Sequence, residues 1–292
     1  MRSFKLSDQK LGWLLCSPAL ITMIIVTAYP IIYAFQLSLF RYDLRFPDSR
    51  AFIGADNYLS VLSSPIWWES LLNTMIITVC SVSVELLLGM AFALIMHRAI
   101  VGRRLVRASI LIPYGIITVV ASLIWKFAFM PSTGFINSMF GMELSWFGER
   151  WSAFLVIILT EIWKTTPFMS LLLLAGLTLV PEDLLRAARV DGASAWQRFT
   201  LIILPIMKPT IAVALLFRTL DAFRIFDTVF VQTRGAQNTE TVSIIGYHAL
   251  ISRLNLGLGS AVSILIFFCV LFIAAAYLKG FGIAGTLTGE EE

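Results

Sequence analysis

The chain has 292 residues, of which 58% are hydrophobic and 14% are charged, and its mean hydropathy is +0.85. One soluble core needs far less apolar material, so the composition excludes an ordinary soluble protein and indicates a polytopic membrane protein. The formal net charge of +4 is modest and gives no indication of nucleic-acid binding.

Six apolar stretches are long enough to cross a hydrocarbon layer of roughly 30 Å at about 1.5 Å per residue. Lipid offers no partner to an unpaired backbone amide, and no alternating barrel pattern is present, so each stretch is predicted to be a helix. The fold class is therefore all-α, with six transmembrane helices in a single domain over residues 1–292. The predicted spans are about 11–40, 71–96, 105–129, 152–179, 206–231 and 259–279.

Basic residues gather on alternate connections between these spans, which predicts the orientation of the chain. The basic set precedes the first span, fills the second and fourth connections and follows the last span: Arg2, Lys5, Lys10, Arg98, Arg103, Arg104, Arg107, Arg186, Arg189, Arg198, Lys208 and Lys279. Both termini are therefore expected in the cytoplasm. The first apolar run is too long for a cleaved signal peptide, and no small-residue cleavage site follows it.

The fourth connection, about residues 181–204, has the signals of a cytoplasmic helix-turn-helix. Pro181 suits a first helical turn, and two acidic residues follow it where the helix dipole is positive. Gly192 can end that helix in a left-handed conformation. Ser194 and Gln197 then have capping-box spacing, which predicts a second helix running to Pro205.

The apolar residues of this insert are predicted to face the membrane domain, leaving Arg186, Arg189 and Arg198 to face water or a partner. They are Leu184, Leu185 and Ala188 on the first helix and Ala195, Trp196, Phe199, Ile202 and Ile203 on the second. The pattern alone fits two roles equally: an amphipathic linker on the lipid surface, or a docking element for another protein.

The insert resembles the EAA motif of permease subunits of bacterial ABC importers: Glu-Ala-Ala, then Asp-Gly-Ala, a later hydrophobic position and Leu-Pro. In that family the motif forms coupling helices that enter a cleft on the ATP-hydrolysing subunit. The resemblance implies the same role here for Ala187, Ala188, Asp191, Gly192, Ala193, Phe199, Leu204 and Pro205. Arg186 stands where the family has its glutamate, which reverses the charge expected at the ATPase contact.

The resemblance extends over the whole chain and is to the carbohydrate-importer branch that includes the maltose permeases, in its six-span form. Residues 161–175, 181–186 and 217–227 are similar to the first permease of mycobacterial-type trehalose importers. After the fifth span, where Gly-Gly-Pro is usual, this chain has Arg234-Gly235-Ala236.

The resemblance implies a multi-pass subunit of the bacterial cytoplasmic (inner) membrane that helps an ATP-driven importer to translocate a sugar. A disaccharide such as trehalose or maltose is expected. The implied partners are a second permease, a pair of ATPase subunits and an extracytoplasmic solute-binding protein or lipoprotein, with membrane lipid around the helices.

The chain lacks the residues that would let it hydrolyse ATP itself. None of its lysines follows a glycine, so the Gly-Lys-Ser/Thr ending of a phosphate-binding loop is missing. ATP and Mg²⁺ are therefore expected on the partner ATPase, with no cofactor in this chain. Cys16, Cys80 and Cys269 lack metal-binding spacing, and no nucleophile-base pair suggests an enzyme.

Ionisable residues inside the predicted spans are the candidates for a substrate path, because such groups are costly unless they face a wet cavity or one another. A sugar site needs polar groups for hydroxyls and aromatic faces for stacking. The candidate path is Tyr114, Glu161, Trp163, Lys164, Asp221, Phe223, Arg224 and Asp227.

Another interpretation is that these charges pair to lock helices together, since Arg218, Asp221, Arg224 and Asp227 recur every third residue. Glu85 is expected to make a hydrogen bond between helices and not to contact substrate. The rival function is an ion-coupled secondary transporter or channel using Glu161, Lys164 and Asp221 as coupling groups. That class predicts an internal inverted repeat, and the sequence shows none.

Overall fold

The computed structural model describes residues 7–98 and 102–281, so the predicted cytoplasmic Arg2 and Lys5 lie outside the described residues. The chain divides into two units, residues 1–64 with 246–267 and residues 65–245 with 268–292. The single domain expected for residues 1–292 stays a prediction.

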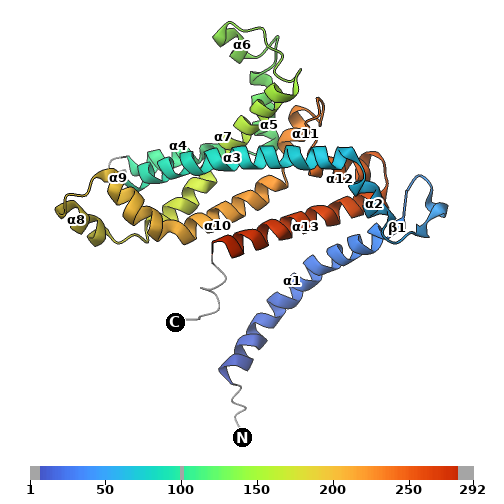
Figure 1. The fold of residues 1–292 in the computed structure, drawn as a ribbon, viewed down its shortest axis with the longest axis horizontal. Coiled ribbons are helices and arrows are strands. Elements are labelled where there is room, and N and C mark those ends of the chain that lie inside the picture. The colour runs from blue at the N-terminus through green and yellow to red at the C-terminus, as the bar shows by residue number, and fades with distance from the viewer. Residues whose placement is uncertain (1–6, 99–101, 282–292) are drawn as a thin grey trace. The chain divides into compact units, whose positions relative to one another are not determined.

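The first unit begins with the long apolar helix α1 (Asp8–Ser38) (Figure 1). Its described side chains are mostly exposed. A short antiparallel ribbon follows, in which β1 (Phe40–Arg41) pairs with β2 (Ala51–Phe52). The remaining elements are the 3₁₀ helix η1 (Pro47–Ser49), α2 (Asp56–Leu62) and the π-helical η3 (His248–Ser252).

Side-chain contacts fix the ribbon and α2 at the end of α1. Asn57 is buried and donates from Nδ2 to the carbonyls of Ser38 and Phe40 at 2.7 and 2.9 Å. Arg45 donates from Nε to Asp43 Oδ1 at 2.9 Å and from Nη2 to Asp43 Oδ2 at 2.6 Å. The side-chain donors of Arg45, together with its backbone N–H, lower the pKa of Asp43 to about 2.

The second unit is almost entirely helical and contains the long spans α3 (Pro65–Arg98), α7 (Arg150–Leu177) and α10 (Leu204–Phe223). Its shorter helices are α4 (Arg103–Gly115), α5 (Thr118–Ala128), α6 (Phe135–Phe140), α8 (Glu182–Val190), α9 (Ala195–Arg198), the π-helical η2 (Phe199–Ile203) and α11 (Asp227–Gln232). Two more, α12 (Val242–Tyr247) and α13 (Leu256–Gly280), run from one unit into the other.

Within the described residues, five helices are long and apolar enough to cross a membrane, or six if one bent pair counts as a span. The pair is α4 and α5, which cover the predicted third span but meet at 89°. The backbone leaves the helix at Ile116 and Ile117, two residues that adopt extended ψ values of 135° and 134° just after Pro113. The span predicted over 105–129 is therefore made of two helices.

The core of the second unit forms where α3 packs along α7, with α10 against both. Met96, Met169 and Met207 are fully buried in its apolar cluster. A Cβ on Gly89 would lie 2.7 Å from Met169 Cγ, so α3 and α7 approach closely at that glycine. Small residues at such positions are typical of helix packing in membranes, where close contact replaces the hydrophobic effect as the source of affinity.

Hydrogen bonds from Asn73 on α3 hold the connection between α11 and α12 in place. Asn73 donates from Nδ2 to the carbonyls of Asn238 and Glu240 at 2.9 and 2.8 Å, and its Oδ1 accepts from Arg150 Nη2 at 2.7 Å. Arg234 has a left-handed φ of 56°, and it occupies the first position of the Gly-Gly-Pro triplet that the resemblance leads us to expect. That backbone conformation explains why glycine suits the position, because glycine reaches it at little steric cost.

Candidate substrate cavity and coupling insert

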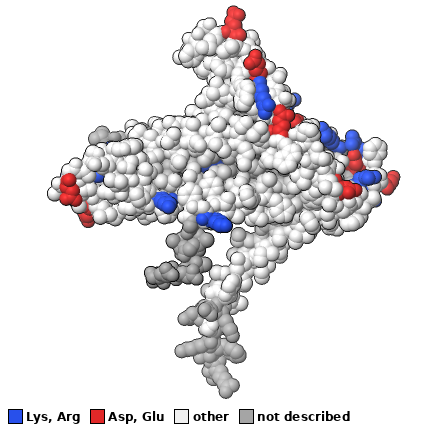
Figure 2. Space-filling view, in the orientation of Figure 1, with Lys and Arg blue, Asp and Glu red and all other residues white. Residues whose placement is uncertain are grey.

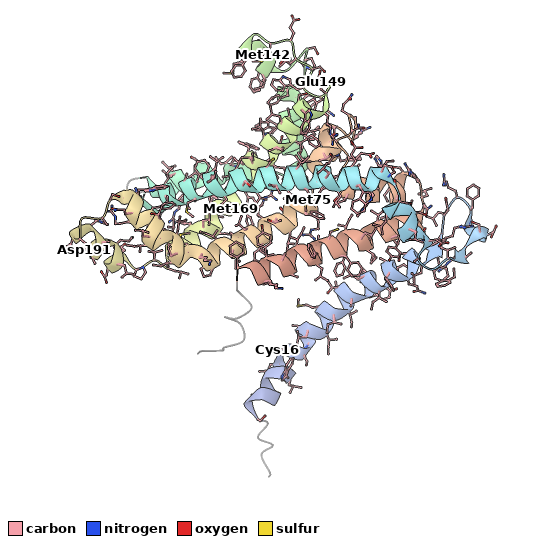
Figure 3. The ribbon with its side chains drawn as sticks, in the orientation of Figure 1. Cys16, Met75, Met142, Glu149, Met169 and Asp191 are labelled. Carbon is pink, nitrogen blue, oxygen red and sulfur yellow. The ribbon has the colours of Figure 1, made fainter. Side chains whose placement is uncertain are left out.

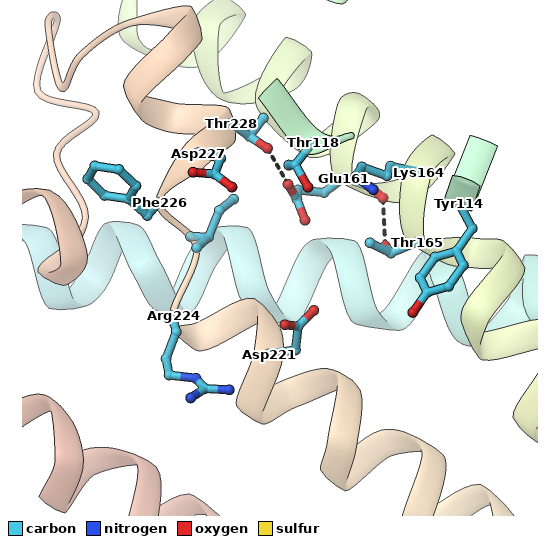
Figure 4. Close-up of a pocket in the computed structure, with 11 residues that line it drawn as sticks. Tyr114, Thr118, Glu161, Lys164, Thr165, Asp221, Arg224, Phe226, Asp227 and Thr228 are labelled. Carbon is cyan, nitrogen blue, oxygen red and sulfur yellow. Dashed lines mark hydrogen bonds between the residues drawn. The ribbon is translucent and has the colours of Figure 1, made fainter. Parts of the chain in front are cut away.

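A cavity of about 510 Å³ opens within the second unit, among α4, α5, α7 and the α10–α11 connection (Figure 4). Six members of the predicted substrate path line it: Tyr114, Glu161, Lys164, Asp221, Arg224 and Asp227. The remaining lining residues, which sequence reasoning missed, are Thr118, Thr165, Ile225, Phe226 and Thr228.

Two interruptions of helical backbone adjoin this cavity. The α4–α5 bend lies between the lining residues Tyr114 and Thr118. Three residues separate the end of α10 at Phe223 from the start of α11 at Asp227. Irregular backbone is tolerated at membrane depth where it lines a cavity, because water or solute can satisfy its polar groups. The second interruption contains neither glycine nor proline, so the sequence gives no breaker signal for it.

Arg218 is the centre of a buried ionic network beneath the cavity. Its guanidinium donates from Nε and Nη2 to Glu85 at 2.5 and 3.0 Å, from Nη2 to Glu161 at 3.1 Å and from Nη1 to Asp221 at 2.9 Å. The side chains of Arg218 and Glu85 are 1% and 0% exposed, whereas that of Asp221 is 67% exposed. The network joins α3, α7 and α10 through side chains alone.

Two threonines complete the hydrogen bonding of the buried carboxylates. Thr165 donates from Oγ1 to Glu85 at 2.7 Å, and Thr228 donates from Oγ1 to Glu161 at 2.5 Å. Buried carboxylates need such donors, because the desolvation penalty of an ion pair is offset only when its remaining lone pairs are satisfied. The helix-locking interpretation thus fits Arg218 and Glu85, whereas Glu161 and Asp221 belong both to the network and to the cavity wall.

Lys164 lies one helical turn after Glu161 on α7 and lines the same cavity (Figure 4). Its Nζ donates to the carbonyl of Ile116 at 2.9 Å and lies 5.7 Å from the centre of the Tyr114 ring. Tyr114 in turn stacks on Phe168 with ring centres 5.6 Å apart. Lys164 therefore satisfies a carbonyl freed by the α4–α5 bend and tethers that bend to α7.

Two predicted path residues lie outside the lining. Phe223 is buried in the protein at 1% exposure, and Trp163 packs against Trp125 with ring centres 6.0 Å apart. The predicted helical spacing of Arg224 and Asp227 does not apply, because the helix stops between them. Figure 4 shows Glu161, Thr118 and Thr228 converging, while Arg224 points away from them.

The cavity can bind a polyhydroxylated solute. Its carboxylates can accept hydrogen bonds from hydroxyl groups, its cationic and threonine side chains can donate them, and Tyr114 and Phe226 contribute aromatic surface to the lining.

The insert folds as two short helices with the predicted turn chemistry. Gly192 has φ of 79°, and the capping box is formed by Gln197 N donating to Ser194 Oγ at 3.2 Å and Ser194 N donating to Gln197 Oε1 at 2.7 Å. Pro181 is the N-cap and not the first helical residue. Figure 3 shows Asp191 at the tip of the insert, and Figure 2 shows acidic side chains gathered at the end where α8 lies.

The predicted apolar face of the insert is partly wrong. Leu185, Phe199 and Ile203 pack against the core, but Trp196 is 71% exposed and Leu184 is also exposed. The π-helical turn of η2 explains the exposure of Trp196, because its wider turn shifts the side chains of α9 relative to the 3.6-residue period used in the prediction. Leu184 lies on the separate helix α8, where Leu185 and not Leu184 faces the core. The insert thus presents Trp196, Leu184 and Arg186 on its surface.

Arg186 is paired within its own helix. Its Nη2 donates to Glu182 Oε2 at 2.9 Å, and both side chains are largely exposed. The carboxylate of Glu182 therefore lies beside the position where the resemblance to the EAA motif implies a glutamate.

Comparison with known proteins places these features in a family. The model of the binding-protein-dependent transport system inner membrane component matches residues 85–281. The trehalose transport system permease protein SugA of Mycobacterium tuberculosis is 53% identical over 280 residues, covering 96% of this chain and 91% of that protein.

The trehalose/maltose transport system permease protein MalF of Thermococcus litoralis is 41% identical, covering 94% of this chain and 95% of that protein. Among solved structures, a bacterial alginate ABC transporter in complex with an alginate pentasaccharide-bound periplasmic protein shares the fold with a TM-score of 0.79. It is 23% identical and covers 93% of this chain and 95% of that chain.

Proposed function

Because this chain belongs to the family of binding-protein-dependent transport system inner membrane components, we propose that its cavity carries a disaccharide, and that trehalose is the first sugar to test. As a member of this family it is a permease subunit of an ABC transporter in the inner membrane, a transport component and not an enzyme. Family membership sets aside the rival secondary transporter or channel.

The observation that carries the choice of sugar is the 53% identity to the trehalose permease over nearly the whole chain. The cavity supports it, because a volume of about 510 Å³ accommodates a disaccharide and its wall mixes carboxylates, cations and aromatic rings. Trehalose and maltose are both neutral and rich in hydroxyl groups, so either matches this chemistry.

The proposed assembly contains a second permease, a pair of ATPase subunits and an extracytoplasmic solute-binding protein or lipoprotein. ATP and Mg²⁺ are bound by the ATPases. Basic residues gather on alternate connections between the spans, which supports a cytoplasmic location for both termini and for the insert. The exposed residues Leu184, Arg186 and Trp196 then face the ATPase.

The placement of the insert suggests how ATP drives transport. The insert connects α7 with α10, and both helices contribute residues to the cavity wall. Closure of the ATPase pair would push the insert, tilt these two helices and open the cavity outward. Hydrolysis would then return the helices to the inward arrangement.

The test is sugar-stimulated ATP hydrolysis and sugar uptake by the assembled transporter. The chain is co-expressed with its partner permease and ATPases, reconstituted in liposomes and supplied with the binding protein and trehalose, maltose or an anionic sugar. Trehalose is expected to stimulate hydrolysis most. No stimulation by any sugar, with ATPase subunits present, would overturn the proposal.

Asp227→Asn tests the cavity, because Asp227 lines it from an exposed position at the start of α11. The variant is expected to raise the KM for sugar several-fold with unchanged assembly, since it removes one acceptor for a hydroxyl group. Glu143→Gln, a matched change in an exposed loop, is the control. Equal KM values for the two variants would remove Asp227 from the path.

A further inference from the structure

A second cavity of about 410 Å³ lies in the larger unit, where the end of α3 meets the insert. Three arginines from three segments line it: Arg98 at the end of α3, Arg189 on α8 and Arg198 on α9. Positive charge thus converges on one cavity from positions that are far apart in the sequence.

The cavity keeps most of this positive charge. Among the described residues that line it, the single carboxylate is that of Glu182, which is already paired with Arg186 at 2.9 Å. Arg198 donates from Nη1 to the carbonyl of Ala193, which fixes its guanidinium while leaving the charge unneutralised. A bound group should therefore carry negative charge.

His97 adds an open hydrogen-bonding position in the same cavity. Its Nδ1 is shielded from solvent and has no hydrogen-bond partner among the described residues. Buried polar atoms are normally satisfied, and an imidazole N–H is a suitable donor to an anionic oxygen.

The rest of the wall is apolar. Leu177, Val180 and Ile203 are buried there, and Leu94 and Leu185 complete the surface. The cavity also lies where α3 ends at Arg98 and α7 ends at Leu177, and both helices are long enough to span a bilayer. Its depth therefore corresponds to the boundary between headgroups and acyl chains.

We propose that this cavity binds an anionic phospholipid, with the phosphate on the arginines and His97 and an acyl chain along the apolar wall. Basic pockets between helices on the cytoplasmic side suit such headgroups. The bound lipid would connect α3 to the insert and so hold the insert in position for the ATPase. Its assignment to the cytoplasmic leaflet rests on the proposed orientation.

A lipid explains the lining better than its rivals. Inorganic phosphate would use the arginines but leave the apolar wall uncovered, and an acidic side chain of the ATPase would do the same. The three occupants therefore predict different results when lipid, soluble phosphate and protein contacts are varied separately.

The experiment compares the assembled transporter in nanodiscs of phosphatidylcholine alone and with added phosphatidylglycerol. Native mass spectrometry measures retained phosphatidylglycerol, and sugar-stimulated ATP hydrolysis measures coupling. The variant Arg189→Gln with Arg198→Gln is expected to bind phosphatidylglycerol about thirtyfold more weakly, equivalent to about 2 kcal/mol at 1.4 kcal/mol per factor of ten. It should also lose the stimulation by this lipid.

The matched control is Arg104→Gln with Lys208→Gln, which removes two exposed basic residues outside the cavity. It should keep the lipid response. Equal lipid binding by both variants would overturn the proposal. So would restoration of coupling in phosphatidylcholine by inorganic phosphate, or an equal loss of coupling by the cavity variant in both kinds of nanodisc.

These outcomes are separate from a failure of the proposed function. If sugar-stimulated hydrolysis occurs in phosphatidylcholine but does not respond to phosphatidylglycerol, and no lipid is retained, only the lipid site is rejected. If no sugar stimulates hydrolysis, lipid retention by mass spectrometry still tests the site.

Discussion

Arg218 shows how one buried side chain can determine the arrangement of three helices. It contacts Glu85 on α3, Glu161 on α7 and Asp221 on its own helix, so its loss would leave carboxylates buried without a counter-charge. An unpaired charge away from water is far more costly than a missing ion pair. We therefore expect that loss of Arg218 lowers the stability of the folded protein, whatever its direct role in transport.

Arg218→Met is predicted to destabilise the protein by about 3–5 kcal/mol, because it breaks a buried ionic network while keeping apolar volume. Thermal unfolding of the detergent-purified protein and the yield of folded protein measure the effect. Arg224→Met, a matched change at the exposed C-cap of α10, should unfold close to the wild-type temperature. Similar losses in both variants would contradict this role.

Asp43 offers a pH-dependent contact outside the membrane spans. Its pKa is about 2 instead of the ordinary 3.8, chiefly because Arg45 donates to its carboxylate. A pKa that is lower in the folded state stabilises the folded ribbon above the ordinary value. This contribution is lost as the pH falls from about 4 towards about 2.

Arg45→Gln is predicted to raise the pKa of Asp43 part of the way to its ordinary value, since the backbone N–H of residue 45 still donates. Carbon-13 NMR of labelled aspartate, assigned with Asp43→Asn, measures the titration. Arg50→Gln is the control, because the Arg50 guanidinium lies over the rings of Phe40 and Tyr42. An unchanged titration in Arg45→Gln would show that the side chain is not the cause.

At the scale of elements, close helix contacts depend on individual glycines. A Cβ on Gly176 of α7 would lie 2.6 Å from Thr210 Cγ2 and 2.8 Å from Thr210 Cβ on α10. Thr210 is β-branched and has little freedom to move aside. The α7–α10 contact is therefore sensitive to one added methyl group.

Gly176→Ala is predicted to destabilise the protein by about 1–3 kcal/mol through overpacking. Gly12→Ala in α1 is the control, because a Cβ there meets nothing within 4 Å. In an exposed helical position the same change should be neutral or slightly stabilising. Thermal unfolding of the two variants should move in different directions, and equal shifts would reject the contact.

The role of Arg186, which replaces the glutamate of the EAA motif on α8, can be tested by substitution. The exposed pair of Arg186 and Glu182 contributes no more than about 1 kcal/mol to stability, so its loss should not unfold the chain. Arg186→Ala is predicted to lower sugar-stimulated ATP hydrolysis several-fold in the assembled transporter, with an unchanged unfolding temperature. The exchange variant, Glu182→Arg with Arg186→Glu, keeps the ion pair but moves each charge to the other residue. It therefore shows whether coupling requires a positive charge at residue 186 or only the presence of the pair. Full activity of Arg186→Ala would mean that this side chain does not take part in coupling.

Sequence patterns predicted the elements best where local chemistry decides the structure. The capping box of Ser194 and Gln197 and the left-handed Gly192 are set by a few neighbouring residues, and both are confirmed. The prediction that Trp196 faces the membrane domain was wrong, because the π-helical turn that follows it depends on packing, which the local sequence period does not reveal. The interruption between α10 and Asp227 has no breaker residue, so no local pattern predicts it, although its residues line the cavity.

At the scale of the whole molecule, the sequence indicated the helical fold and the family, because hydropathy and the EAA-like motif are properties of the chain itself. It left open which charges pair and which line a cavity, since Arg218 and Glu85 are separated by 133 positions in the sequence. Glu161 and Asp221 belong to both groups, so the two interpretations of the membrane charges are not exclusive.

The chain alone is predicted to carry no sugar across a membrane, because its sequence lacks a phosphate-binding loop. Liposomes containing only this chain should show no uptake of labelled trehalose above protein-free liposomes, with or without an ion gradient. Adding the partner permease, the ATPases, the binding protein and ATP should restore uptake. Gradient-driven uptake by the chain alone would contradict the assignment to an ATP-driven transporter.

Helix α10 begins next to the insert and ends at the cavity, a length of about 30 Å for its 20 residues. If its two ends move together, binding at them is subject to thermodynamic reciprocity. Whatever factor ATP imposes on the affinity for sugar, sugar must impose on the affinity for ATP. The ratio of the nucleotide affinities measured with and without sugar would thus give the coupling free energy between the two ends of α10.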